Sequence, residues 1–304
     1  MKRLRFACEA AAFRLLLLAA RALPRRLLLA AGSFAGRLGC ALDGRHRRIA
    51  EGNLLRALGG AMTTARARRL TRDCWRHFGR ITFDTLSFPR LGPESADRLV
   101  RYEGLEHLRE AYTRGKGVLI FTGHFGHWEL AGLMQGHLGL PLSVVARPLD
   151  NPALERMLAE LRSGSGNRII YKRNAVKEIL KGLREGLGVA IVIDQDARRD
   201  GIFVPFFGRL ASTTPTLALL ALRTGAPVIP CFSTPEPDGT YRVVYEPEVV
   251  PEQTGDRDED ILRLTARCTA IIERWVRRRP EVWLWMHRRW KTRPPGEAGG
   301  EATE

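Results

Sequence analysis

The sequence predicts an α/β fold in which a mostly parallel central sheet is flanked by helices, behind a helical amino-terminal region. Two observations lead to this prediction. Beyond Arg101, short runs of strand type alternate with helical stretches, as expected of βα units around a parallel sheet. The chain has 304 residues, 44% of them apolar, which is enough for a sizeable core.

Three segments follow from the composition along the chain. Residues 1–42 form an amphipathic segment, residues 43–293 an α/β domain that begins with arginine-rich helices, and residues 294–304 a tail rich in Gly, Pro and Glu. Such a tail buries little apolar surface, so we expect it to be disordered.

The amino-terminal segment has the pattern of a helix that lies at a membrane surface. A spanning helix needs about 20 apolar residues, whereas the longest uncharged runs are Leu15–Ala20 and Leu27–Gly36. Arg14, Arg21 and Arg25 share one side of a helix. We expect the segment to lie on or partly enter an anionic leaflet, with a tilted span and a cleaved signal as alternatives.

The elements of the domain follow from periodicity and from turn residues. Pro24 starts a second helical piece after a break. The predicted strands are Gly117–Thr122, Leu142–Ala146, Arg168–Tyr171, Val189–Ile193, Val228–Phe232 and Tyr241–Tyr245. The predicted helices of the α/β part are Glu129–Leu138, Ala153–Ser163, Ala175–Glu185, Thr214–Thr224 and Asp258–Arg277.

Charge and cysteine content limit the classes of partner and compartment. The formal net charge of +16 favours anionic partners, among them nucleic acid, phospholipid headgroups and acidic carrier molecules. The five cysteines are odd in number and form no CxxC pair, so neither a disulfide framework nor a zinc ribbon is indicated. A reducing compartment fits best.

The strongest chemical signal is a histidine directly after the first predicted strand of the sheet. His124 follows Gly123, and Glu129 begins the next helix five residues later. Loops at the carboxyl ends of parallel strands form the clefts of open sheets. We predict that Glu129 accepts the Nδ1 proton of His124 and leaves Nε2 free as a general base.

Two other interpretations of this motif stay open. His124 could merely end the strand and cap the helix, or His124, His127 and Glu129 could bind a metal, although their order matches no common helical zinc pattern. No G-x-S-x-G elbow occurs, and no cysteine is flanked like a nucleophile. This favours direct group transfer without a covalent enzyme intermediate, and we expect neither metal nor cofactor.

Further candidate binding residues follow other predicted strands. Arg147 and Asn151 lie in a turn rigidified by two prolines, and an arginine there suits a phosphate or a carboxylate. Asp194 and Asp196 come after the strand at Val189–Ile193, where they either shape a site or pair with nearby arginines.

Two aromatic segments each allow more than one interpretation. Phe203 and Phe207, with Thr214, form either an apolar wall for an acyl chain or ordinary core. Residues 275–291 interleave tryptophan with arginine, which suits a membrane interface, stacking on single-stranded nucleic acid, or buried indoles beside a solvated basic face.

The motifs taken in series resemble a known family. HFGHWE, RPLDNP, DQDARRDGIFVPFFG, TPTLALLALRTGAPVIP and WLWMHRRWK occur in this order over residues 117–291. Together they resemble the lysophospholipid acyltransferase superfamily, in particular the late lauroyl and myristoyl acyltransferases of lipid A biosynthesis, with a glycerolphosphate-acyltransferase-like fold.

The resemblance implies a bacterial enzyme on the cytoplasmic face of the inner membrane. It would transfer a fatty acyl group from acyl carrier protein to a hydroxyl of a phosphorylated, Kdo-bearing lipid A precursor. In it, His124 would be the general base, Glu129 its orienting carboxylate and Arg147 a ligand of acceptor phosphate or of the donor arm, while Asp194 and Asp196 would shape the site.

Four alternatives remain. The resemblance extends to acyltransferases of phosphatidylinositol mannosides, which use acyl-CoA, and to lysophospholipid acyltransferases. From the charge alone, a basic nucleic-acid-binding protein or a non-catalytic scaffold at a membrane surface is also conceivable, although no recognised nucleic-acid module is present.

Overall fold

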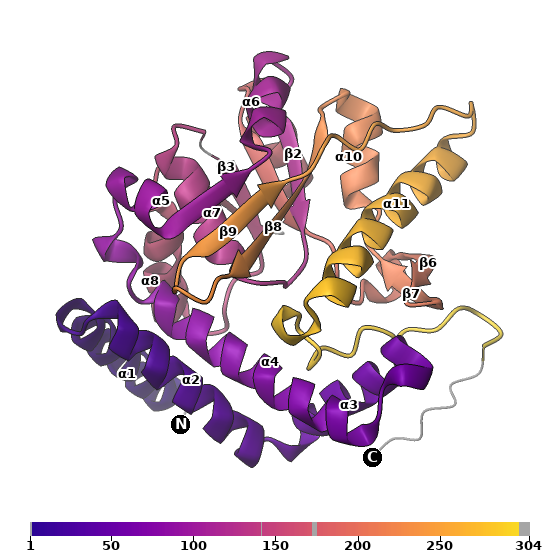
Figure 1. The fold of residues 1–304 in the computed structure, drawn as a ribbon. Coiled ribbons are helices and arrows are strands. Elements are labelled where there is room, and N and C mark those ends of the chain that lie inside the picture. The colour runs from indigo at the N-terminus through magenta and orange to yellow at the C-terminus, as the bar shows by residue number, and fades with distance from the viewer. Residues whose placement is uncertain (1, 141, 172–174, 298–304) are drawn as a thin grey trace.

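A seven-stranded sheet forms the centre of the computed structural model, which describes residues 2–140, 142–171 and 175–297 (Figure 1). Its strand order is β1-β9-β8-β2-β5-β3-β4. All neighbours run parallel except β8 and β9, which form an antiparallel pair. The strands are β1 Val100–Glu103, β2 Val118–Thr122, β3 Leu142–Ala146, β4 Arg168–Tyr171, β5 Gly188–Val192, β8 Val228–Pro235 and β9 Tyr241–Tyr245.

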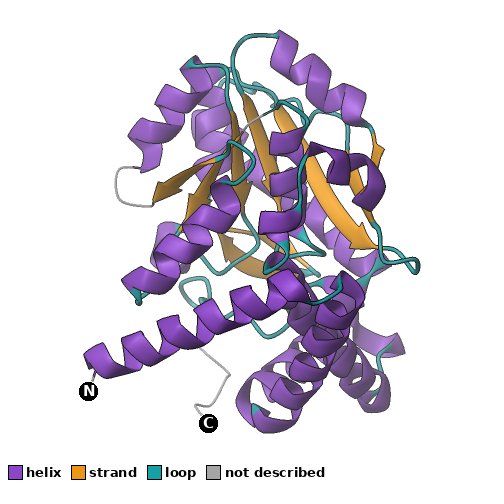
Figure 2. Cartoon of the chain, turned by 90° about the vertical axis from the view of Figure 1, so that its left-hand side faces the viewer, coloured by secondary structure: helices purple, strands orange, loops and turns teal. Residues whose placement is uncertain are grey.

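Helices cover both faces of this sheet (Figure 2). They are α5 Pro93–Leu99, α6 Leu105–Thr113, α7 Trp128–His137, α8 Pro152–Ser163, α9 Ala175–Arg184, α10 Thr216–Thr224 and α11 Arg257–Arg278. The predicted α/β class is confirmed, and each strand and helix predicted after residue 101 is present within a few residues of its expected ends. Side chains alternate across β2, since Val118 and Ile120 join one apolar cluster and Leu119 and Phe121 the other.

The sequence prediction missed α6, β1 and a two-stranded hairpin. β1 is a short edge strand that exposes Arg101 and Glu103, so it lacks the apolar run of a central strand. The hairpin consists of β6 Ile202–Phe206 and β7 Arg209–Thr213. Its turn residues Phe207 and Gly208 have φ angles of 54° and 71°. A two-residue turn with positive φ angles usually carries Asn-Gly or Asp-Gly. Because Phe207 stands in the place of Asn or Asp, the sequence gives no clear signal for this turn.

The amino-terminal region ahead of α5 contains four α-helices: α1 Lys2–Ala22, α2 Arg25–Leu42, α3 Gly44–Leu58 and α4 Thr64–Thr85. Pro24 lies directly before α2, as predicted. The backbones of α2 and α4 touch because both helices carry glycine at the contact. A Cβ atom on Gly79 would lie 2.2 Å from the Gly32 carbonyl oxygen, and one on Gly36 would lie 2.2 Å from that of Trp75.

A buried ion pair joins the amino-terminal helices to the sheet. Asp84 on α4 is 1% exposed and accepts hydrogen bonds of 2.8 and 2.6 Å from Arg25 on α2. The Tyr241 hydroxyl on β9 donates to the same carboxylate at 2.9 Å. Burial raises the pKa of Asp84, but the hydrogen bonds and the charge of Arg25 outweigh burial, so this pKa lies below its usual value. The helices are therefore fixed to the sheet by a satisfied buried charge.

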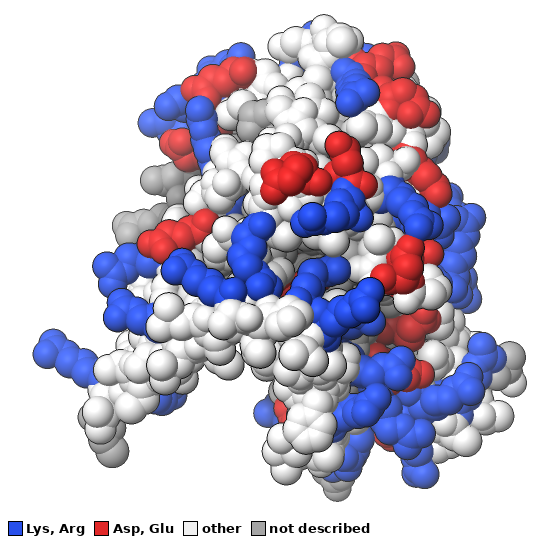
Figure 3. All heavy atoms as spheres, turned by 60° about the vertical axis from the view of Figure 1, so that its left-hand side comes forward, with Lys and Arg blue, Asp and Glu red and all other residues white. Residues whose placement is uncertain are grey.

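Large apolar side chains remain exposed along α1 and α2. Figure 3 shows uncharged surface at the lower end of the molecule, bordered by Lys and Arg. The exposed apolar residues of this region are Leu4, Leu15, Leu16, Leu18, Leu23, Leu27, Phe34, Leu38 and Leu42. Among the described residues, every helix is either too short or too polar to cross a bilayer. The tail predicted as disordered covers residues 294–304, of which 298–304 lie outside the described residues.

We expect Gly79→Ala to destabilise the protein by about 1–3 kcal/mol, because the added methyl group forces the α2 and α4 backbones apart. Gly132→Ala is the matched control, since a Cβ there meets nothing within 4 Å and alanine favours the helix. Urea unfolding of both variants measures the difference. Equal midpoints for the two variants would show that the close helix contact is unimportant.

Candidate functional site

The carboxyl edge of the sheet brings His124 and Asp194 together. β2 and β5 are adjacent and parallel, and Thr122 at the end of β2 is in register with Val192 at the end of β5. His124 and Asp194 each follow two residues later, so both emerge at the same edge. Gly123 allows the approach, because a Cβ atom there would lie 2.8 Å from Asp194 Oδ2.

Asp194 fixes both the backbone and the ring of His124. The His124 amide N–H donates to Oδ2 at 2.6 Å, and Nδ1 lies 2.7 Å from Oδ1. The Trp283 indole donates to Oδ2 at 2.7 Å, which satisfies a carboxylate that is only 4% exposed. A proton on Nδ1 therefore points at Asp194, and Nε2 is left as a hydrogen-bond acceptor.

The two groups shift each other's pKa. Burial lowers the pKa of His124, but the charge and hydrogen bond of Asp194, with a smaller contribution from Glu129, raise it above its ordinary value. Burial raises the pKa of Asp194, but the charge of His124 and the hydrogen bonds from His124 and Trp283 outweigh burial. The pKa of Asp194 therefore lies below its ordinary value, and Asp194 stays ionised.

The prediction that Glu129 accepts the Nδ1 proton of His124 is wrong. Glu129 lies in the first turn of α7, where it forms a bidentate ion pair with Arg162 of α8. In this pair, Arg162 Nε donates to Glu129 Oε2 at 2.9 Å. Trp128 occupies the position beside the imidazole, with the ring centroids 5.2 Å apart. Glu129 lines the same cleft and acts on His124 through its charge only.

His127, the second histidine of the motif, faces the opposite direction. Its Nδ1 accepts from the Leu130 amide at 3.4 Å, and its Nε2 lies 3.6 Å from Asp84 Oδ2. Burial lowers the pKa of His127 to about 4, so the ring is neutral at pH 7. The metal interpretation required His124 and His127 to face one common point, and they do not. Within residues 2–140, 142–171 and 175–297, no three His, Cys, Asp or Glu side chains are grouped as metal ligands.

The carboxyl-terminal segment, residues 283–292, contacts the turn that carries Asp194 and fixes its position. Trp283 binds Asp194, and Arg289 donates to the Gln195 carbonyl at 3.4 Å. His287 Nε2 accepts the Asp196 amide N–H at 2.9 Å. The tryptophans of residues 275–291 are buried, which agrees with the buried-indole interpretation rather than with a stacking platform; they are Trp275, Trp283, Trp285 and Trp290.

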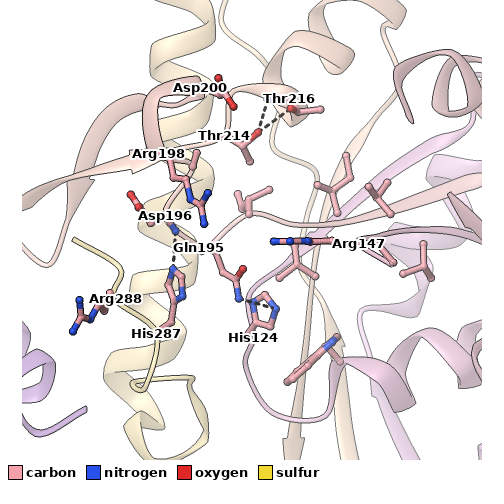
Figure 4. Close-up of a pocket in the computed structure, with 18 of the residues that line it drawn as sticks. His124, Arg147, Gln195, Asp196, Arg198, Asp200, Thr214, Thr216, His287 and Arg288 are labelled. Carbon is pink, nitrogen blue, oxygen red and sulfur yellow. Dashed lines mark hydrogen bonds between the residues drawn. The ribbon is translucent and has the colours of Figure 1, made fainter. Parts of the chain in front are cut away.

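A cleft of about 980 Å³ opens beside His124 (Figure 4). One part of its wall is apolar and comes from β3, α9, β5 and the residue directly after β5, with Val144, Val145, Val176, Ile179, Ile191 and Ile193. Another part is cationic, with Arg45, Arg147, Arg198, Arg288 and Lys291. The cleft thus combines an apolar and a cationic surface beside a histidine.

The structure places three of the predicted binding residues in this cleft. Arg147, Asp196 and Thr214 all line it. Thr214 Oγ1 lies 2.8 Å from Thr216 Oγ1 near the start of α10, and Thr292 donates to Asp196 Oδ2 at 2.9 Å. Of these residues, Arg147 turns its guanidinium toward the side of Gln195 and His124 in Figure 4.

Three predicted binding residues lie elsewhere. Asn151 is buried at the start of α8, where its amide donates to the Phe6 carbonyl at 2.9 Å and to Glu9 at 3.0 Å, so it fastens α1 to the domain. Phe207 is buried against Trp285 and Trp290. Phe203 lies on β6 outside the residues that line the cleft. Phe203 and Phe207 thus do not line the cleft, and Phe207 belongs to the core, which was the alternative interpretation of this segment.

Sequence reasoning missed Arg162, Gln195 and His287. Gln195 stands between two singled-out aspartates, and its position at a strand end is the signal that could have identified it. Arg162 has no such signal, because it is one arginine among many on helices.

The site and the fold together define an α/β protein with a charge-paired histidine at the carboxyl edge of a parallel sheet, beside an apolar cleft. The chain belongs to the bacterial lipid A biosynthesis acyltransferase family, whose model matches residues 6–292.

Individual relatives support this assignment. The chain is 35% identical over 200 residues to the lipid A biosynthesis palmitoleoyltransferase of Escherichia coli, covering 64% of this chain and 63% of that protein. It is 32% identical over 197 residues to the lipid A biosynthesis lauroyltransferase of the same organism, covering 64% of this chain and 62% of that protein. A phosphatidylinositol mannoside acyltransferase of Mycolicibacterium smegmatis is 27% identical over 190 residues, with 61% and 60% covered. The aligned part thus spans less than two thirds of each relative.

We expect His124 to titrate above its ordinary pKa of 6.5, because Asp194 stabilises the imidazolium. Asp194→Asn removes this charge while burial persists, so the pKa of His124 falls; Glu129→Gln lowers it less, since Glu129 is not bonded to the ring. Nitrogen-15 NMR of the histidine ring over about pH 4–9, a range centred on the ordinary value, would measure the pKa of His124 in the wild type and in both variants. An unchanged titration in Asp194→Asn would contradict the assignment.

Proposed function

We propose that this protein transfers a fatty acyl chain from acyl carrier protein to a hydroxyl of a Kdo-bearing lipid A precursor, with His124 as general base. The observation that carries the proposal is the His124–Asp194 pair, whose 2.7 Å contact at Nδ1 leaves Nε2 as an acceptor beside an apolar cleft. A sugar hydroxyl is a weak nucleophile at neutral pH and needs such a base.

The proposed reaction is a direct transfer. Nε2 of His124 takes the proton as the hydroxyl oxygen attacks the thioester carbon, and the carbonyl electron pair moves to its oxygen. Collapse of this intermediate expels the donor thiolate, which receives the proton from His124, and an ester is formed. Asp194 stabilises the imidazolium in between. The described residues that line the cleft include neither Ser nor Cys, and the hydroxyl groups of its two threonines, Thr214 and Thr216, are hydrogen-bonded to each other at 2.8 Å. This favours direct transfer over an acyl-enzyme.

The apolar and cationic parts of the cleft suit the two ends of such substrates. The aliphatic surface formed by Val144, Val145, Ile179 and Ile191 accommodates a hydrocarbon chain. Arg147 suits an acceptor phosphate or the phosphate of the donor arm, because guanidinium binds phosphate oxygens in a bidentate manner. The formal net charge of +16 favours both an acidic carrier and a phosphorylated glycolipid.

The runner-up is an acyl-CoA-dependent transfer to a phosphatidylinositol mannoside or to a lysophospholipid. The name of the Mycolicibacterium smegmatis relative supports the glycolipid version. Turnover with purified acyl carrier protein thioester and with acyl-CoA in parallel separates the donors. Mass spectrometry of lipids from cells with and without the gene identifies the acceptor and the acyl length.

We further propose that the enzyme works on the cytoplasmic face of the inner membrane, with residues 1–42 as the membrane-associating segment and residues 43–293 as the acyltransferase domain. The exposed leucines of α1 and α2, such as Leu15 and Leu18, would enter the interface. Arginines beside them attract anionic headgroups. Asn151 links α1 to α8, which follows the loop of Arg147.

His124→Ala is expected to lower kcat/KM for acyl transfer by about 10²–10⁴-fold, since a positioned base contributes that much. Vesicle binding should match the wild type, and the variant should still unfold cooperatively but at a lower temperature, because buried Asp194 loses its ring partner. Arg223→Gln on α10, whose side chain lies outside the cleft, serves as the control and should keep full activity. Retained turnover in His124→Ala would eliminate the proposed mechanism.

A double variant, Leu15→Glu and Leu18→Glu, is expected to weaken binding to vesicles of anionic phospholipid at least tenfold, because it places two charges on the apolar surface of α1. Co-sedimentation measures this, and circular dichroism checks that the helices persist. Binding equal to that of the wild type would place the membrane contact elsewhere.

A further inference from the structure

The side chain of Gln195 reaches the free nitrogen of the proposed base. Gln195 is exposed in the cleft, and its Nε2 lies 3.4 Å from Nε2 of His124 (Figure 4). Because the other ring nitrogen of His124 faces the Asp194 carboxylate, Nε2 accepts and the amide donates. A hydrogen-bond donor therefore stands beside the place where the nucleophile must bind.

The backbone that carries Gln195 is fixed on both sides. Asp194 is held by His124 and Trp283, and the Asp196 amide donates to His287. The Gln195 carbonyl accepts from Arg289, which is fully buried. The amide is thus mounted on a rigid turn, while its tip is free of other protein partners among the described residues. Pre-positioned donors of this kind stabilise charge without reorganisation.

Attack on a thioester places negative charge on the carbonyl oxygen, one bond away from the carbon that the nucleophile attacks. The incoming hydroxyl must displace the Gln195 amide from Nε2 of His124. The new C–O bond then holds the carbonyl oxygen within the reach of the displaced amide. We propose that Gln195 is a catalytic residue that donates a hydrogen bond from Nε2 to the oxyanion of the tetrahedral intermediate. This inference rests on the proposed acyl transfer and names a second group in it.

Gln195 neither gives nor takes a proton in this reaction. The proton of the hydroxyl goes to His124 and then to the leaving thiolate, while the electron pair on the oxyanion reforms the carbonyl bond as the C–S bond breaks. Gln195 only donates a hydrogen bond, more strongly in the intermediate than in the ground state. A group that acts in this way lowers kcat when it is removed and leaves KM nearly unchanged.

Two other roles for Gln195 would give different kinetics. An amide that binds the acceptor sugar would raise the KM of the acceptor when removed. An amide that only braces the resting His124 ring would change kcat little, because Asp194 still orients the ring. The proposal is therefore tested by separating kcat from the two KM values.

Gln195→Ala and Gln195→Glu are the informative pair. Glutamate has nearly the same shape but lacks the donor and places negative charge beside the oxyanion. We expect kcat to fall by about 10²–10³-fold in Gln195→Ala, the loss typical of one oxyanion donor, and at least as much in Gln195→Glu. Both KM values should stay within about threefold, as differential binding requires. Any hydrolysis of the donor without acceptor should fall in parallel.

The assay uses the full-length protein in mixed micelles with lauroyl-acyl carrier protein and a purified Kdo-bearing lipid A precursor, at a pH on the activity plateau. Arg199→Gln is the control, because this exposed arginine of the same loop lies outside the cleft lining and should keep full activity. Melting curves confirm that the variants fold.

A kcat for Gln195→Ala within threefold of the wild type, or a loss confined to the KM of the acceptor, would overturn the inference. His124→Ala separates this failure from that of the proposed function. If His124→Ala is inactive while Gln195→Ala is fully active, only the role of Gln195 is refuted. If His124→Ala itself remains active, the proposed acyl-transfer mechanism fails.

Discussion

The site depends on one buried carboxylate. Asp194 has its oxygens occupied by the His124 amide, the His124 ring and the Trp283 indole, and it remains ionised although it is 4% exposed. A buried charge without these partners would cost several kcal/mol. The contacts therefore select a single arrangement of three chain segments, the loop after β2, the turn after β5 and the carboxyl-terminal segment, and that arrangement directs Nε2 of His124 into the cleft.

The same loop is fastened from the amino-terminal side. His77 Nε2 on α4 lies 3.1 Å from the carbonyl oxygen of Gly126. Gly126 also approaches Ser233 closely, since a Cβ atom on Gly126 would lie 1.4 Å from the carbonyl oxygen of Ser233. The ion pair of Arg25 and Asp84 places α2 against the same helix. The proposed membrane-associating helices and the loop that carries His124 are thus parts of one packed unit, which would hold the cleft at a fixed height above a bilayer.

Local pattern predicted most of the fold, because the strands after residue 101 are apolar runs bounded by turn residues, and their helices have clear periodicity. It also predicted that His124 and Asp194 lie at the site, since both follow strands. It chose the wrong carboxylate for His124, because Glu129 is close in sequence whereas the register of β2 and β5 brings Asp194 across 70 positions. Asn151 and Phe207 were also misplaced, because tertiary contacts set their positions. Asn151 binds α1, and Phe207 packs against buried indoles.

The most direct test of the account is the pH dependence of the single-turnover rate of acyl transfer, compared between the wild type and Asp194→Asn. A base is active only when unprotonated, so the wild-type rate should fall on the acid side through the raised pKa of His124. In Asp194→Asn the acid limb should move to lower pH, and the plateau should fall because the ring is less basic and less well oriented. Superimposable profiles for the two proteins would contradict the claim that Asp194 sets the basicity of His124.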